Sequence, residues 1–138
     1  KMTGGFISYW SNVTKNPKEP EYEFGKKMID TPKIVFSKTL DRVSWVNTRL
    51  ASGDLSEEIN QLKNKQGKGI MVYGGASFVS ALIKNNLIDQ YHLFINPVAI
   101  GKGLTIFGKL TDKWNMIQVH TEAFSCGIVV HQYQPGLQ

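Results

Sequence analysis

The spacing of hydrophobic and polar residues along the chain predicts several short strands. Residues 33–36 form a brief run of β-branched and aromatic side chains, which is typical of a buried strand, and residues 42–46 indicate a second one. Residues 69–73 read as apolar throughout, as expected of a central strand that is buried on both faces. A further strand is expected at residues 89–95.

Helical patterns separate these strands. Residues 23–29 fit a short helix, and Asp54 or Ser56 can cap a second helix whose first turn is acidic. Residues 77–84 place apolar side chains on one face of a third helix, which Asn85-Asn86 can end in the left-handed conformation. The helices therefore alternate with the strands, as they do in α/β proteins.

The last quarter of the chain has a different pattern. Residues 114–124 and 127–133 are extended segments joined by a short turn, which predicts a β-hairpin, and residues 99–108 before them are expected to form a glycine-rich loop. The order of elements predicts an α/β fold with a mostly parallel central sheet, flanked by helices, and an antiparallel hairpin at the C-terminal edge. Residues 1–138 are expected to form a single domain.

Composition and charge exclude several classes of protein. Hydrophobic residues make up 41% and charged residues 20% of the chain, which is ordinary for a globular protein. The sequence lacks an apolar run of about 18 residues, so no membrane span is expected. The lone Cys126 cannot form an internal disulfide, which fits a cytoplasmic location. The net charge is +5, but the basic residues are dispersed, so nucleic acid is not an expected partner.

The clearest candidate for chemistry is the pair Gly74 and Gly75, between an expected strand and an expected helix. Glycine lets backbone N–H groups approach a ligand closely, and a helix N-terminus adds free donors and a partial positive charge suited to a pyrophosphate. A tight turn without a ligand explains the pair equally well. The full Gly-x-Gly-x-x-Gly fingerprint is absent, which argues against a Rossmann site.

A second candidate anion site follows the strand at residues 33–36. Ser37, Lys38 and Thr39 offer two hydroxyls and an ammonium, which together can bind a phosphate. Taken alone, this tripeptide is more simply an ordinary polar turn, but the two sites together favour a dinucleotide. The three histidines are too far apart for a metal motif, so no metal site is expected; they are His92, His120 and His131.

Several blocks of sequence resemble the dihydrofolate-reductase-like family. The most specific blocks are residues 72–76, which read Val-Tyr-Gly-Gly-Ala, residues 87–93 and residues 97–103. Residues 33–40 and the opening residues 1–6 extend the resemblance to nearly the whole chain. Within this family, the chain is most similar to the bacterial branch grouped with the reductase domain of the bifunctional riboflavin deaminase–reductase.

The resemblance implies an NADPH site. It implies that the paired glycines contact the pyrophosphate, often across a cis peptide bond, and that the following helix start completes the phosphate site. By the same resemblance, the turn after the first strand receives the 2′-phosphate that selects NADPH over NADH. Tyr73 can line the nicotinamide pocket, although a packed core tyrosine is the simpler interpretation. The implied cofactor-binding residues are Thr3, Ser37, Lys38, Thr39, Tyr73, Gly74, Gly75, Ala76, Ser77 and Phe78.

The resemblance also implies what the chain lacks. Family members begin with a central strand, a substrate loop and a helix, and this chain is expected to lack that N-terminal part of the domain. The segment carries the acidic residue that supports protonation in dihydrofolate reductases, so no catalytic residue is assigned here. Phe94 stands where those enzymes often keep a threonine, which argues against folate as substrate. The open sheet edges are compatible with a homodimer.

Two functions therefore remain open at the level of sequence. The first is an NADPH-dependent reductase that transfers hydride to a small-molecule substrate, a pteridine- or pyrimidine-like heterocycle. The alternative is a non-catalytic nucleotide-binding module with the same fold.

Overall fold

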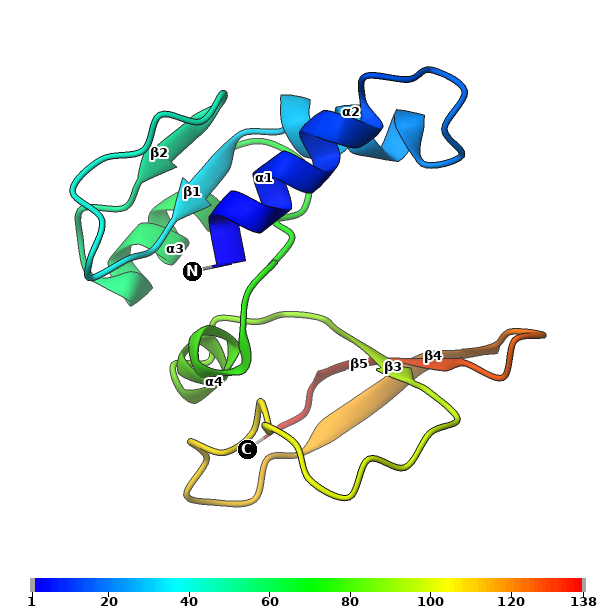
Figure 1. The fold of residues 1–138 in the computed structure, drawn as a ribbon. Coiled ribbons are helices and arrows are strands. Elements are labelled where there is room, and N and C mark those ends of the chain that lie inside the picture. The colour runs from blue at the N-terminus through cyan, green and yellow to red at the C-terminus, as the bar shows by residue number, and fades with distance from the viewer. Residues whose placement is uncertain (1, 138) are drawn as a thin grey trace. The chain divides into compact units, whose positions relative to one another are not determined.

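The computed structural model describes residues 2–137 of the chain, with side chains described from residue 4 onward. The chain is a mixture of helices and strands that divides into two compact units, Lys1–Glu58 and Ile59–Gln138 (Figure 1). The expected α/β class is confirmed, with one small parallel sheet and one antiparallel sheet.

The first unit contains two helices and a parallel pair of strands. Lys33 of the first strand lies opposite Thr48 of the second. The expected helix at 23–29 and strand at 33–36 are confirmed, whereas the second strand forms later than residues 42–46. A left-handed turn at Asn47, with φ of 52°, immediately precedes it, and the Asn47 carbonyl accepts the Lys33 N–H. The elements are α1 (Met2–Val13), α2 (Tyr22–Asp30), β1 (Lys33–Val35) and β2 (Thr48–Leu50).

Helix α1, which the sequence patterns did not reveal, packs on α2 through aromatic side chains. Trp10 is buried, and its ring meets those of Tyr9 and Phe24 edge to face, with centroids 4.8 and 5.1 Å away. Such pairs add about 0.5–1.5 kcal/mol to the free energy gained from burial alone. Gly25 of α2 lets the helices approach, because an added Cβ would lie 3.0 Å from Val13 and 3.4 Å from Trp10.

A lysine links the end of α2 to β1. The Lys33 ammonium donates hydrogen bonds to the carbonyl groups of Met28, Ile29 and Thr31, at 3.2, 2.7 and 2.9 Å. A cation suits the C-terminal end of a helix, where unpaired carbonyls carry a partial negative charge. Burial lowers the pKa of Lys33, and the nearby Asp30 carboxylate partly opposes that shift. The Lys33 side chain therefore stabilises the short connection between α2 and β1.

Helix α3 (Leu55–Lys63) begins at the expected acidic turn. Asp54 caps it, since its Oδ1 accepts the backbone N–H groups of Ser56 at 2.8 Å and Glu57 at 3.4 Å. Glu58 is buried and accepts two hydrogen bonds from the Arg49 guanidinium, at 2.6 and 3.3 Å. These bonds join α3 to β2.

The second unit contains one helix and a three-stranded antiparallel sheet in the order β3-β5-β4. The expected helix, the left-handed residue Asn86 with φ of 53° and the C-terminal hairpin are all confirmed. The hairpin turns at Gly127, whose φ of 88° favours glycine. Residues 99–108 form the expected loop, without strand or helix. The elements are α4 (Ala76–Lys84), β3 (Tyr91–Ile95), β4 (Met116–Ala123) and β5 (Val129–Pro135).

The core of the second unit is small. Leu82 and Ile83 of α4 are fully buried, and Tyr91 and Val130 contribute from β3 and β5. Ser80 fixes the middle of α4 to the following loop, since its hydroxyl donates to the Ile106 carbonyl at 2.6 Å. Among the described helices, none is long and apolar enough to cross a bilayer.

The expected central strand at residues 69–73 does not form. This segment is irregular, and the side chains of Ile70, Met71 and Tyr73 are 50%, 64% and 61% exposed. A strand needs a neighbour to pair its backbone N–H and C=O groups, and β3 pairs only with β5 in the described residues. Among the described residues, parallel pairing is therefore limited to β1 and β2, rather than forming most of a central sheet.

Two glycines in the first unit test the helix packing. Gly5→Ala should raise the free energy of unfolding by roughly 0.5–1 kcal/mol, because alanine favours a helix and nothing lies near the new methyl group. Gly25→Ala gains the same helix propensity, but crowding against Val13 costs about 1–3 kcal/mol and should outweigh it. Urea unfolding followed by circular dichroism measures both. Equal stabilisation by both substitutions would contradict the packing of α1 on α2.

The Arg49–Glu58 pair predicts a dependence of stability on pH. The hydrogen bonds from Arg49, followed by that from the Ser52 N–H, hold the pKa of Glu58 below its usual value of 4.5. A depressed pKa stabilises the fold above the unfolded pKa, and that contribution disappears as the pH falls through the folded value. Glu58→Gln should therefore lower the urea midpoint at pH 7 and cease to do so in strong acid. Glu57→Gln removes the same charge from the same turn and is the control.

Candidate cofactor site

Helix α4 begins without a side-chain cap. Gly75 is the N-cap residue, and its carbonyl accepts the N–H groups of Phe78 at 3.0 Å and Val79 at 3.1 Å. The N–H groups of Ala76 and Ser77 come too early in the helix to reach an acceptor within it. They have no acceptor among the described residues, and they lie at the positive end of the helix. The start of α4 can therefore hold an anion such as a pyrophosphate.

The two positions before α4 differ in whether the structure explains why each is a glycine. Neither has a positive φ, and Gly75, with φ of −73° and ψ of 165°, adopts a conformation open to any residue. At Gly74 an added Cβ would lie 2.8 Å from Cδ1 of Phe78, so packing against that ring favours glycine. The described peptide bonds are all trans, so the cis bond that the resemblance implies is not found. At Gly75 the backbone conformation does not require glycine, so it does not explain why this position has no side chain.

The side chains around this turn are mostly accessible. Tyr73 is 61% exposed, so the alternative of a packed core tyrosine is wrong for this structure. Ser77 is exposed, and Phe78 is half-buried with its ring beside Gly74. Within residues 73–78, Tyr73, Gly74 and Ser77 are therefore accessible to a ligand, whereas Phe78 begins the side of α4 that packs inward.

The second predicted anion site is a compact turn that directly follows β1. The Ser37 hydroxyl oxygen accepts the backbone N–H groups of Thr39 and Leu40, both at 3.1 Å, and lies 3.4 Å from Oγ1 of Thr39. Lys38 and Thr39 are exposed, and Lys38 makes no ion pair within the described part of the chain. Ser37 therefore shapes the turn, and Lys38 remains available to a ligand.

The predicted cofactor residues are divided between the two units. Ser37, Lys38 and Thr39 belong to the first unit, and residues 73–78 belong to the second. Thr3 lies in the first turn of α1, and its side chain falls outside the described residues, as does all of Lys1. The structure thus places the pyrophosphate candidates together in one segment and the 2′-phosphate candidates together in another.

Two buried polar groups were not singled out from the sequence. The Tyr91 hydroxyl and the Trp114 indole N–H are buried and have no hydrogen-bond partner among the described residues. Burial raises the pKa of Tyr91, and the charge of Asp89 adds to the rise. An unpaired buried group of this kind typically costs about 1–3 kcal/mol. Only the tertiary surroundings reveal such groups, because both residues look like ordinary core aromatics in the sequence.

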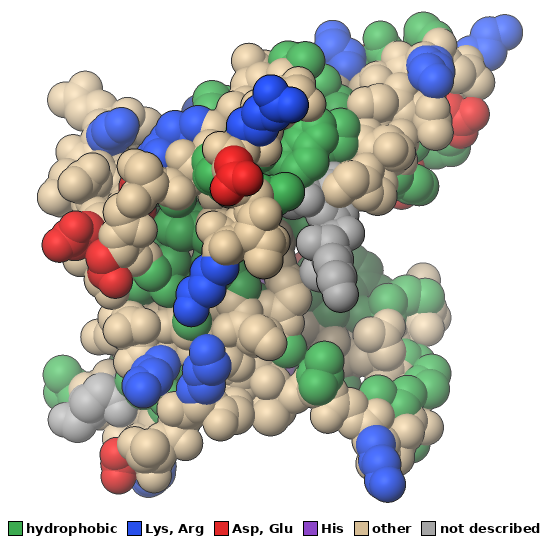
Figure 2. Space-filling view, turned by 60° about the vertical axis from the view of Figure 1, so that its left-hand side comes forward, with side chains coloured by type: hydrophobic (Ala, Val, Ile, Leu, Met, Phe, Trp, Pro, Cys, Tyr) green, Lys and Arg blue, Asp and Glu red, His purple; other side chains and the backbone are tan. Residues whose placement is uncertain are grey.

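The distribution of charge is even on the face drawn in Figure 2. Lys and Arg side chains are spread among uncharged side chains there, and hydrophobic side chains also reach the surface. Among the described residues, no group of three or more His, Cys, Asp and Glu side chains is arranged to hold a metal ion. The candidate site is therefore built from backbone donors and single lysines rather than from a charged cluster.

Comparison with known proteins identifies relatives in bacteria. The uncharacterized protein YyaP of Bacillus subtilis (strain 168) is 34% identical over 123 residues, which cover 87% of this chain and 64% of YyaP. The uncharacterized protein YwjB of the same organism is 30% identical over 71 residues, covering 51% of this chain and 41% of YwjB. The chain therefore spans less than two thirds of the length of either relative.

Two solved structures share the fold. A putative riboflavin biosynthesis protein from Shewanella sp. PV-4 superposes with a TM-score of 0.65 and 21% identity, over 78% of this chain and 62% of that one. A pyrimidine reductase-like protein from Corynebacterium diphtheriae superposes with a TM-score of 0.57 and 17% identity, over 89% of this chain and 54% of that one. At these identities the likeness concerns the fold alone.

The family itself is identified from the sequence. The family described as the RibD C-terminal domain matches residues 4–130, which is nearly the whole chain. The match includes both candidate phosphate segments and most of the hairpin. It confirms the resemblance to the reductase domain of the riboflavin deaminase–reductase. The chain belongs to the RibD C-terminal domain family.

Proposed function

We propose that this chain is part of an NADPH-dependent reductase that acts on a pteridine- or pyrimidine-like heterocycle. Membership of the RibD C-terminal domain family supports a reductase role. The names of the two similar structures, a riboflavin biosynthesis protein and a pyrimidine reductase-like protein, point to the same class of substrate. The observation that carries the proposal is the uncapped start of α4 directly after the glycine pair.

In this proposal the start of α4 holds the pyrophosphate of the cofactor. The N–H groups of Ala76 and Ser77 need an acceptor, and a pyrophosphate oxygen supplies one together with the negative charge that the helix end favours. Without a side chain at Gly75, the phosphate can approach the backbone closely. This requirement accounts for glycine at a position where the backbone conformation does not demand it.

The turn after β1 supplies the preference for NADPH over NADH. Lys38 and the Thr39 hydroxyl are exposed and can bind the 2′-phosphate through charge-assisted hydrogen bonds. Ser37 keeps the turn in shape through its bonds to Thr39 and Leu40. When bound, NADPH supplies the hydride, and the residues of this chain hold and orient the cofactor.

A nucleotide-binding module without turnover is the second candidate. The same phosphate contacts support it, because backbone donors at α4 bind a nucleotide whether or not a reaction follows. The two candidates differ in one measurement, the loss of reduced-nicotinamide absorbance when a pteridine or an aminopyrimidine is added. Steady oxidation of NADPH supports the reductase, whereas binding without oxidation supports the module.

The pyrophosphate site is tested by Gly75→Val. The new side chain stands where the phosphate approaches, and losing even one charge-assisted hydrogen bond of about 1.5–3 kcal/mol should weaken NADPH at least roughly tenfold. Valine is compatible with the extended backbone at this position, and circular dichroism checks that the variant is folded. Calorimetry measures the affinity, and Gly67→Val, in open space nearby in the sequence, is the control. Unchanged NADPH affinity in folded Gly75→Val would remove the proposed site.

The preference between cofactors is tested by Lys38→Glu. A carboxylate facing the 2′-phosphate repels it, so NADPH binding should weaken about tenfold while NADH binding changes less than about twofold. Lys18→Glu makes the same change of charge in another exposed loop of the first unit and should affect neither cofactor strongly. Equal losses for NADPH and NADH in Lys38→Glu would show that this turn does not recognise the 2′-phosphate.

A further inference from the structure

The ring of Phe78 covers Gly74, the first residue of the glycine pair. A Cβ added at Gly74 would lie 2.8 Å from Cδ1 of Phe78 and 3.6 Å from its Cβ and Cγ, which are the nearest atoms beyond the neighbours in the chain. Carbon atoms in contact stay about 3.5–4.0 Å apart, so a methyl group here would force the ring or the turn to move by about 0.7 Å. A single side chain of the protein therefore accounts for glycine at residue 74.

Phe78 is also tied to the turn through its backbone. Its N–H group donates to the Gly75 carbonyl at 3.0 Å, which closes the first turn of α4. The side chain is half-buried and lies one helical turn before Leu82, which is 1% exposed, so both residues belong to the inward face of the helix. The ring is therefore carried by a helix that is fixed in the core of its unit.

The chain that leads into the turn is not held by a strand. Residues 69–73 are irregular and exposed in the described structure. In many helices a hydrophobic residue before the N-cap packs on the first turn and fixes the angle at which the chain enters. Gly74 occupies that position without a side chain, and the Phe78 ring lies against it instead. The ring thus fixes the entry angle although residue 74 has no side chain of its own.

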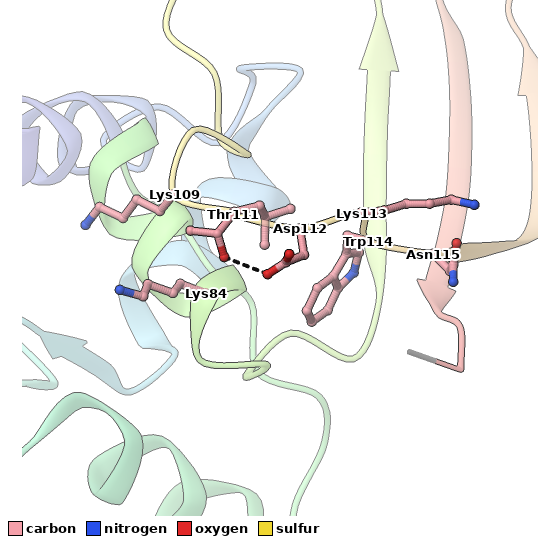
Figure 3. Close-up of a pocket in the computed structure, with 8 residues that line it drawn as sticks. Lys84, Lys109, Thr111, Asp112, Lys113, Trp114 and Asn115 are labelled. Carbon is pink, nitrogen blue, oxygen red and sulfur yellow. Dashed lines mark hydrogen bonds between the residues drawn. The ribbon is translucent and has the colours of Figure 1, made fainter.

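The other end of α4 is independent of this contact. It adjoins a cavity of about 430 Å³, where the ammonium groups of Lys84 and Lys109 point away from the Trp114 ring (Figure 3). The helix has nine residues, so Lys84 is about 12 Å along the axis from Ala76. A substitution at Lys84 therefore alters the same helix without reaching the glycine turn.

We propose that Phe78 is a positioning residue of the candidate cofactor site, an inference that rests on the proposed function. Its ring, packed against Gly74, fixes the direction in which the chain enters α4 and so places the N–H groups of Ala76 and Ser77 for the pyrophosphate. Groups that bind a ligand must keep their places to within about 0.5 Å, which is less than the shift that a methyl group at residue 74 imposes. The two glycines thus have separate roles, since Gly74 makes room for the ring and Gly75 for the phosphate.

The test is a double-mutant cycle on NADPH affinity, measured by calorimetry on variants whose folding is checked by circular dichroism. Gly74→Ala should weaken NADPH about tenfold in the native chain, because the new methyl group and the ring displace the turn. In a Phe78→Ala background the methyl group meets only the remaining Cβ at 3.6 Å, so Gly74→Ala should weaken NADPH less than about twofold. Phe78→Ala alone should weaken NADPH at least about threefold, because the turn loses its support.

Two controls separate this role from a general loss of stability. Val79→Ala shortens another half-buried side chain of the same helical turn, and in its background Gly74→Ala should still weaken NADPH about tenfold. Lys84→Ala alters the far end of α4 and should leave NADPH affinity unchanged.

Two milder substitutions at Phe78 complete the set. Phe78→Tyr keeps the ring against Gly74 and should bind NADPH within about twofold of the native chain. Phe78→Val lacks Cδ1 but keeps more apolar volume than alanine, so it takes the place of Phe78→Ala in the cycle should that variant fail to fold. In the Phe78→Val background too, Gly74→Ala should weaken NADPH less than about twofold.

An equal loss of NADPH affinity from Gly74→Ala in the native and Phe78→Ala backgrounds would overturn the inference, because the cofactor or the backbone, and not the ring, would then require glycine. Unchanged affinity in folded Gly74→Ala would overturn it as well. A native chain that does not bind NADPH would instead remove the proposed function itself. The first titration of the cycle therefore distinguishes the two failures.

Discussion

The unpaired backbone N–H groups at the start of α4 are the feature on which the proposed chemistry depends. A helix always begins with donors that it cannot satisfy itself, and a serine, threonine or aspartate usually satisfies them. Helix α3 follows this rule through Asp54, whereas α4 begins with Gly75 and has no side-chain cap. Helix α2 also begins without a side-chain cap, so α4 is distinguished by the combination of an uncapped start and the glycine pair directly before it. A phosphate group of the cofactor at that position would accept these free N–H groups, so the contacts that satisfy the helix start would also bind the cofactor.

The same need for backbone partners accounts for the main departure from the expected sheet. Residues 69–73 have the apolar composition of a buried strand, yet they are irregular and exposed in this structure. Composition produces a strand only where a neighbouring strand pairs with it, and in the described residues β3 pairs with β5 alone. The parallel pairing that the sequence predicts is therefore confined to three residues each of β1 and β2.

Contacts along its length hold helix α4 in its unit. Its first turn presents backbone donors, its last turn presents Lys84, and Ser80 between them is tied to the loop at Ile106. The buried residues Leu82 and Ile83 fix the helix in the core of its unit. A short helix held in its middle thus keeps the backbone donors of its first turn in a fixed place.

The sequence by itself determined the features that local patterns encode. The helix after Gly75, the cap at Asp54, the left-handed Asn86 and the C-terminal hairpin follow from periodicity and turn residues, which act within a few positions of the chain. The family was also evident from contiguous blocks of residues. Only the tertiary structure decided which apolar segment paired, that Tyr73 is exposed, and that the indole N–H of Trp114 is buried without a partner. These features depend on what lies opposite each group in space, and no local pattern carries that information.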